Sequence, residues 1–534
     1  MVAVPENLEN AAPAVKRVPV TIDAWAADPP GDFSWPAPFP GTIQPMADFY
    51  RRYVDEVIAE SDADVRNILL MGRRPMQLLA LIQFALWCDA ARKRGERMVG
   101  DDILDYLSGA SREMPPALQV MPLAKGRARL VGLRRILRTA SWTTAWRLPR
   151  AMLAPDGVAL THNSLLRTYL RHSPDAVRNA YDEDFPLKNL TRDKSFARGV
   201  DALELAGRMA GALVRDLLLD GDIKARLADT MRAVLSESYR DAMEVTGRLR
   251  AARNLPRKLV TGTGGKRISR ALGLEIMRRG GEVTRCDHGG SFLLLHHPHY
   301  MALNELSVST RFVVATPLAA ESSDAAAGCE RARPLADCVI AGSRGDPGLD
   351  VGAGALTRSV PATGKRRAMY VPSIFYGLNQ ASPPVPPGSL YLAWQRRLVA
   401  ALQGISGVEL IWKPHPSGHK PPAHLDPARD IKTLSAPFEQ AVAEADLLIY
   451  DFPATTTLAV GLCTDRPIVL VDHGNMRFNP WLRHEVEARC SFVVCGYDEH
   501  NLPTVSRDEL EDAICDSPPS ADPTFFRSLF LGDT

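Results

Sequence analysis

Apolar residues recur at helical spacing through the first part of the chain. The pattern is clear at 54–58, at 68–70 and in the twelve-residue run 76–87, MQLLALIQFALW. That run is shorter than the roughly 20 apolar residues that cross a bilayer, so it predicts a buried core helix. We therefore expect residues 1–150 to be mostly helical after a proline-rich lead-in.

Short apolar runs alternate with helical patterns in two later stretches, 151–360 and 366–515, which a glycine- and proline-containing segment at 342–361 connects. Such runs are typical of parallel strands that are buried on both faces. The predicted strands are 258–261, 282–285, 312–315, 338–340, 368–371, 408–412, 447–450, 468–471 and 491–494, and the predicted helices lie near 268–276, 391–402, 438–444 and 455–462. The alternation predicts an α/β fold with two Rossmann-like domains that face a cleft, followed by a tail at 516–534.

The strand predicted at 282–285 runs directly into Asp287, His288, Gly289 and Gly290. Glycines let a substrate approach the backbone, and an imidazole beside a carboxylate could accept the proton of an attacking hydroxyl. A loop histidine bonded only to backbone is the alternative interpretation.

A glycine turn that contains Gly264 follows the strand at 258–261. Its spacing fits neither a phosphate-binding P-loop nor a dinucleotide fingerprint. The turn could contact a ligand through its backbone, or it could be structural.

Two motifs follow strands of the last stretch. Lys413 and His415 come after the strand at 408–412, and each is held next to a proline. Asp451 follows the strand at 447–450, and Thr455 and Thr456 begin the next predicted helix. Cationic side chains and a helix start rich in threonine both suit a phosphate group, whereas a chance basic loop and simple helix capping are the alternatives.

The charge of the chain is balanced overall but not locally. Lys and Arg number 64 against 62 Asp and Glu, so the net charge of +2 argues against an obligate nucleic-acid binder. The segment 124–150 has eight basic residues and no acidic one, with leucine, isoleucine and tryptophan between them. That composition is typical of a helix on anionic lipid, and contact with an acidic surface of the same chain is the alternative.

The eight cysteines form no CxxC pair, so we expect reduced thiols and neither a zinc site nor a disulfide framework. The cluster of His296, His297 and His299 lacks a carboxylate or thiolate partner, and we expect no metal there. With no signal peptide and no spanning segment predicted, we expect a cytoplasmic protein, which 124–150 would hold on the inner membrane face if the lipid interpretation is right.

The order of these motifs over residues 255–480 resembles that of bacterial surface-polysaccharide transferases of GT-B type, of the capsule and O-antigen kind. The similarity is strongest to surface-carbohydrate biosynthesis transferases and weaker to CDP-glycerol glycerophosphotransferases and to CMP-Kdo and CMP-sialic acid transferases. Those proteins commonly have Gln-His-Gly-Gly where this chain has Asp287 before His288. Many continue with Gly-Tyr-Gly, where this chain has Ser291 and Phe292.

The resemblance implies a metal-independent glycosyltransferase with no cofactor, which uses a nucleotide-activated sugar and a polysaccharide or lipid-linked acceptor. A histidine base favours inversion of the anomeric carbon. The residue roles it implies are His288 as base beside Asp287, backbone contacts to the acceptor at Gly264, Gly289 and Gly290, and donor binding by Lys413, His415, Asp451, Thr455 and Thr456. Transfer of a polyol phosphate from a CDP-alditol, and a non-catalytic scaffold with the same fold, are the two alternatives.

Overall fold

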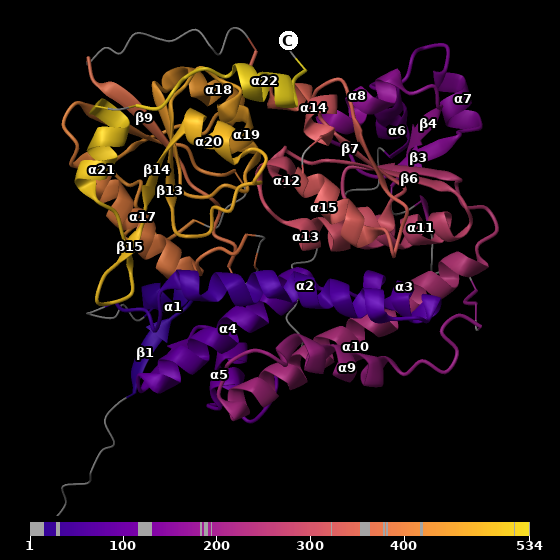
Figure 1. Ribbon diagram of the computed structural model, residues 1–534, viewed down its shortest axis with the longest axis horizontal. Helices are drawn as coiled ribbons and strands as arrows, with labels where there is room; N and C mark the ends of the chain where they lie inside the picture. The colour runs from indigo at the N-terminus through magenta and orange to yellow at the C-terminus, as the bar shows by residue number, and fades with distance from the viewer. Residues whose placement is uncertain are drawn as a thin grey trace, which may run out of the picture.

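The computed structural model describes residues 15–27, 33–115, 131–181, 184–185, 191–193, 195–321, 323–352, 364–377, 380, 383–416, 420–516 and 518–532. They form a helical layer that lies beneath two domains, each built on a six-stranded sheet (Figure 1). Residues 124–130, which include Lys125, Arg127 and Arg129 of the predicted basic segment, lie outside the described residues, as does much of the proline-rich lead-in.

The helical layer holds the core helix predicted at 76–87, which is part of α4 and is mostly buried. Strands β1 (Lys16–Pro19) and β2 (Glu96–Val99) pair in parallel beside it. The helices of the layer are α1 (Ile22–Ala27), α2 (Ile43–Ala59), α3 (Ala63–Met71), α4 (Pro75–Lys93), α5 (Asp102–Ser108), α9 (Ala202–Val214) and α10 (Gly221–Ala251). Since α9 and α10 pack against α2, α3 and α4, a boundary at residue 150 does not separate this layer from the rest of the chain.

The first large sheet is parallel throughout, with the strand order β4-β3-β5-β6-β7-β8. Its strands are β3 (Gly157–Ala159), β4 (Val177–Asn179), β5 (Lys258–Thr261), β6 (Glu282–Cys286), β7 (Arg311–Val314) and β8 (Val339–Gly342). Its helices are α6 (Val131–Ala140), α7 (Leu148–Leu153), α8 (Ser164–His172), α11 (Arg267–Arg278), α12 (Ser291–Leu294), α13 (Pro298–Asn304), α14 (Pro317–Ala320) and α15 (Ser323–Ala332).

The second large sheet is also parallel, with the order β11-β10-β9-β12-β13-β14. Its strands are β9 (Arg366–Val371), β10 (Val408–Trp412), β11 (Lys432–Thr433), β12 (Leu447–Tyr450), β13 (Ile468–Asp472) and β14 (Cys490–Val494). Its helices are α17 (Gly388–Gln403), α18 (Phe438–Ala441), α19 (Thr456–Leu462), α20 (Arg483–Arg489) and α21 (Arg507–Glu511), and a hairpin of β15 (Gly496–Tyr497) and β16 (Pro503–Thr504) adjoins them. This is the strand order of a dinucleotide-type Rossmann sheet.

The predicted class, two Rossmann-like α/β domains with a mainly helical N-terminal region, is therefore confirmed. The tail predicted at 516–534 is not a free extension in the part that is described. Its helix α22 (Thr524–Phe530) returns to the first domain, where Thr316 Oγ1 donates to Leu529 O at 2.7 Å and the Asp346 N–H donates to Phe530 O at 2.7 Å. Within the described residues, no helix is long and apolar enough to cross a membrane.

Candidate active site

Parallel sheets bind ligands beyond the carboxyl ends of their strands, at the point where the strand order reverses. In the second sheet that point lies between β9 and β12, so the loops that begin at Pro372 and Asp451 flank it. The predicted residues Lys413 and His415 follow β10, on the other side of β9. Neighbouring strands are about 4.8 Å apart, so the ends of β10 and β12 are about 10 Å apart, a span that a nucleotide can bridge.

The Asp287–Gly290 turn follows β6 as predicted, and it exposes the His288 imidazole to solvent. Asp287 is buried, and its carboxylate accepts the His288 backbone N–H at 2.7 Å. Burial raises the pKa of Asp287 to about 7. The carboxylate therefore stabilises the turn through its hydrogen bond from the His288 backbone N–H. Within the described residues it makes no hydrogen bond to the imidazole itself.

The same turn meets the start of α19 across the domain boundary. Gly289 has φ +76°, and a Cβ built on it would lie 2.3 Å from Thr456 Oγ1. Gly290, with φ +72°, is also closely packed, since its Cβ would lie 2.9 Å from the Phe530 ring of α22. Two motifs that lie far apart in the sequence, His288-Gly289 and Thr455-Thr456, are thus brought together.

Backbone pairing holds the two domains at this point. The His296 N–H donates to Arg477 O at 2.9 Å, and the Asn479 N–H donates to Leu294 O at 2.8 Å. The Asn479 side chain adds a bond from Nδ2 to Leu293 O at 3.1 Å. The short α12 segment therefore connects His288 at one end with the second domain at the other.

Thr455 caps α19, because its hydroxyl accepts the Leu458 N–H at 3.2 Å. Its Oγ1 also accepts a bond from the Thr457 hydroxyl at 3.1 Å. Thr456 remains exposed beside Gly289, so it is the threonine of this pair whose side chain is open to a ligand.

Asp451 is buried and bonded within the second domain. Its carboxylate accepts the Tyr370 hydroxyl at 2.5 Å, the Tyr391 hydroxyl at 3.0 Å and the Trp394 indole N–H at 3.1 Å. Burial raises the pKa of Asp451 to about 6. With three protein donors already in place, this carboxylate positions the aromatic residues around the switch point, and direct donor contact stays a prediction from the resemblance.

Lys413 and His415 differ in how accessible they are. The Lys413 side chain is buried, its ammonium donates to Pro414 O at 3.0 Å, and burial lowers its pKa. The His415 ring is exposed, and its pKa is lowered by partial burial and by the Lys413 ammonium. His415 is therefore the residue of this motif that is placed to touch a ligand.

His415 lines a cavity of about 150 Å³, which we call the C-terminal cavity. Phe375 after β9, Gln395 on α17 and Trp412 at the end of β10 also line it. Gln395 is only 1% exposed; its amide lies beside the Tyr391 hydroxyl, yet neither amide atom meets hydrogen-bond geometry with any described residue. A cavity lined by a buried amide and by the aromatic side chains of Phe375 and Trp412 suits a flat heterocycle.

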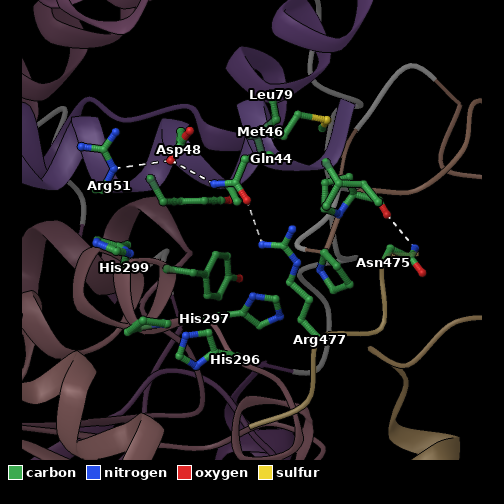
Figure 2. A pocket seen from close by; sticks show the side chains of 17 residues that line it. Gln44, Met46, Asp48, Arg51, Leu79, His296, His297, His299, Asn475 and Arg477 are labelled. Atoms are coloured by element: carbon green, nitrogen blue, oxygen red, sulfur yellow. Dashed lines mark hydrogen bonds and ion pairs between the residues drawn. The ribbon is translucent and has the colours of Figure 1, made fainter. Parts of the chain in front are cut away.

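A larger cavity of about 270 Å³, the junction cavity, lies where the helical layer meets both domains (Figure 2). Arg477 donates from Nη1 to Gln44 Oε1 at 3.0 Å, and Gln44 Nε2 donates to Asp48 Oδ1 at 3.2 Å. Arg51 also approaches Asp48, whereas Arg477 has no carboxylate partner among the described residues. His296, His297 and His299 line the opposite wall (Figure 2).

Gly264 packs against Asn304 and Glu305 of the same domain. Its N–H donates to Glu305 Oε2 at 2.7 Å, and a Cβ built on it would lie 2.1 Å from Asn304 O. The close backbone approach that the glycine turn suggested is therefore satisfied within the first domain, and an acceptor contact at Gly264 stays a prediction.

Two further residues of the candidate site, Asn163 and Gln395, were not predicted from the sequence. Asn163 follows β3, a three-residue strand with too short an apolar run to predict, and its Nδ2 donates to Asp287 O at 2.8 Å. Gln395 lies inside a helix that was predicted, but nothing in the sequence says which face of that helix lines a cavity.

No group of three or more histidine, cysteine, aspartate or glutamate side chains among the described residues is arranged to hold a metal ion. His296, His297 and His299 line one cavity without forming such a group. Near the strand ends, the Lys413 ammonium and a ring N–H of His415 are groups that could bind a phosphate.

No family model and no curated protein matches the sequence. Among solved structures, the chain is similar to the glycotransferase of kitacinnamycin at 14% identity and a TM-score of 0.33, over 70% of this chain and 93% of that one. It is also similar to the glycosyltransferase SnogD from Streptomyces nogalater at 14% identity and a TM-score of 0.27, over 70% of this chain and 97% of that one. Both scores are below 0.5, and it is the strand order and register of the two parallel sheets that define the fold.

Proposed function

We propose that the protein is a glycosyltransferase that moves a sugar from a nucleotide-activated donor to a saccharide acceptor in the synthesis of a bacterial surface polysaccharide. The observation that carries the proposal is the contact of Gly289 with Thr456, because it places an exposed histidine of one domain beside the switch-point helix of the other. The surface-polysaccharide role rests on the motif resemblance.

In this proposal the donor lies on the second domain. The C-terminal cavity takes the nucleobase between Phe375 and Trp412, where the Gln395 amide can donate to and accept from its edge. The phosphate groups extend toward β12, with His415 at one end and Thr456 at the other. Lys413, close behind His415, adds positive charge where the leaving group becomes negative.

The acceptor approaches from the first domain and the junction cavity. The imidazole of His288 takes the proton of the acceptor hydroxyl as the oxygen attacks the anomeric carbon of the donor sugar. The bond from that carbon to the donor phosphate oxygen breaks, and the nucleotide leaves with the bonding electrons. A single displacement of this kind inverts the anomeric carbon.

Nucleotide binding tests the proposal directly. The full chain is heated with CMP, CDP, UDP or GDP, and its melting temperature is compared with that of the free protein. A nucleotide present at 100 times its Kd stabilises the folded state by about 2.7 kcal/mol, which is a clear shift. If none of the four nucleotides shifts the melting temperature, the proposal fails and a non-catalytic scaffold explains the fold better.

The products separate the two kinds of transfer. Sugar transfer releases the nucleotide with all its phosphate groups, whereas polyol-phosphate transfer breaks the pyrophosphate and leaves phosphorus on the acceptor. Phosphorus analysis of the purified product therefore distinguishes a glycosyltransferase from a CDP-alditol enzyme. Phosphorus incorporated into the acceptor would contradict the proposal.

A further inference from the structure

Helix α6 (Val131–Ala140) turns an apolar face toward solvent. Leu133, Ile136, Leu137 and Ala140 follow the spacing i, i+3, i+4 and i+7, which places them on one side of the helix. All four are exposed, with Leu133 at 56% and Leu137 at 60%. An amphipathic surface helix normally buries its apolar side against its own protein. In α6 the apolar side instead faces solvent.

The opposite side of α6 fixes that orientation. Thr139 is fully buried, and its Oγ1 accepts the Asn179 N–H of β4 at 3.1 Å. Arg135 forms an ion pair with Asp184. Just beyond the helix, buried Trp142 donates from Nε1 to Val177 O at 2.9 Å. The apolar side therefore faces outward because the polar side is bonded to the edge of the first sheet.

The exposed surface continues into α7 (Leu148–Leu153). Trp146 is 72% exposed with the Arg147 guanidinium over its ring at 4.5 Å, and Leu153 is 86% exposed. Figure 1 shows α7 at the upper outer corner of the first domain and α6 beside β4, both away from the helical layer. Five of the large apolar side chains that the described chain exposes lie between residues 133 and 153, namely Leu133, Ile136, Leu137, Trp146 and Leu153.

The charge beside this apolar surface is positive. Arg134 and Arg138 are exposed on the flank of α6, next to Leu133 and Leu137 along the helix. The stretch from 131 to 153 contains no acidic residue. An apolar stripe with a tryptophan, flanked by arginines, matches the interface of an anionic bilayer, where the side chains enter the acyl boundary and the guanidinium groups meet the headgroups.

We infer that α6 and α7 dock the protein on an anionic lipid surface through Leu133, Ile136, Leu137, Trp146 and Leu153, with Arg134 and Arg138 on the headgroups. None of these residues lines the junction cavity or the C-terminal cavity, so docking is separate from the proposed transfer chemistry. It holds the enzyme at a membrane, where a lipid-linked saccharide would be presented.

Vesicle co-sedimentation of the full chain tests the docking surface. Vesicles of phosphatidylcholine with phosphatidylglycerol are expected to bind the protein, and vesicles of phosphatidylcholine alone are expected to bind it about tenfold less. The double variant Leu133→Glu, Leu137→Glu is expected to lower binding to the anionic vesicles about tenfold or more, since it places charge in the apolar stripe. Arg134→Glu with Arg138→Glu is expected to act similarly and to remove the salt dependence.

The matched control is Leu203→Glu with Leu218→Glu, which changes two exposed leucines of the helical layer, at 48% and 91% exposure. All three double variants should keep the melting temperature of the parent protein because the changed side chains are exposed. The inference is overturned if the parent binds neither kind of vesicle, if it binds both kinds equally, or if the control pair loses as much binding as the α6 pair. An acidic protein that binds α6 while anionic vesicles do not would also overturn it.

Discussion

Gly289 and Thr456 touch across the two domains so closely that no side chain fits between them. A Cβ on Gly289 would lie 2.3 Å from Thr456 Oγ1, and φ at this residue is +76°. Both the contact and the left-handed backbone require glycine. Residue 289 therefore sets the distance between the His288 turn and the start of α19.

Gly289→Ala is expected to reduce transfer about 100-fold, because an added methyl group pushes the His288 turn away from the second domain. Gly280→Ala is the matched control, since Gly280 has φ +74° but nothing within 4 Å of its Cβ position. Each variant costs about 1–2 kcal/mol for the left-handed backbone, so a small loss of melting temperature is common to both. Steady-state rates that fall equally in the two variants would show that the contact itself is unimportant.

His288→Ala is expected to lower kcat/KM about 100-fold or more, because the proposal makes this imidazole the general base. The melting temperature should not change, since the ring is exposed and makes no hydrogen bond within the described residues. His484→Ala, which removes another exposed histidine, is expected to leave both quantities unchanged. A purified His288→Ala protein with parental turnover would remove this residue from the mechanism.

Much of the fold was predictable because buried parallel strands leave continuous apolar runs. The runs at 258–261, 408–412 and 447–450 coincide with β5, β10 and β12. Strands β3 and β4 were not predicted because three residues are too few to show a pattern, and the inclusion of α9 and α10 in the helical layer depends on long-range packing.

The candidate site was predictable only where residue types typical of a turn or a helix start occur in the sequence. A glycine pair after a strand indicated the His288 turn, and a threonine run indicated the start of α19. The contact between them depends on how two domains pack, which no local pattern reports. The three hydrogen bonds to buried Asp451 and the position of Gln395 at the C-terminal cavity likewise follow from tertiary packing.

Gln395→Leu is expected to weaken nucleotide binding about tenfold, because the amide that would bond the nucleobase is lost. The thermal shift at a fixed nucleotide concentration measures this loss. Gln440→Leu is the control, since Gln440 lies on α18, outside the residues that line the C-terminal cavity. An unchanged nucleotide shift in Gln395→Leu would place the nucleobase elsewhere.

Arg477→Ala is expected to raise KM for the saccharide acceptor about tenfold with little change in kcat, because a guanidinium without a carboxylate partner among the described residues is lost from the junction cavity. Arg483→Ala is the control, since that exposed arginine is paired with Glu487 at 2.7 Å. The same KM for parent and Arg477→Ala would show that Arg477 does not bind the acceptor in the junction cavity.

His473 predicts how stability depends on pH. The ring is 1% exposed and packs against Trp394 at 4.5 Å, neither ring nitrogen has a partner among the described residues, and burial lowers its pKa from 6.5 to about 3. Below pH 6.5 the unfolded chain takes up a proton that the folded protein does not. The contribution of His473 to the free energy of unfolding is therefore fully present above pH 6.5. It decreases as the pH drops toward 3, by up to about 1.4 kcal/mol per pH unit.

His473→Leu is expected to remove this part of the acid sensitivity, since leucine does not titrate and fills a similar buried volume. The measurement is the free energy of urea unfolding from pH 7.5 to pH 5, for the parent, for His473→Leu and for the exposed-residue control His484→Ala. The curve for His473→Leu should be flatter below pH 6.5, while that for His484→Ala should follow the parent. Parallel curves for the parent and His473→Leu would mean that the ring accepts a proton in the folded state at its ordinary pKa, and so that Trp394 and its neighbours do not shield it from water.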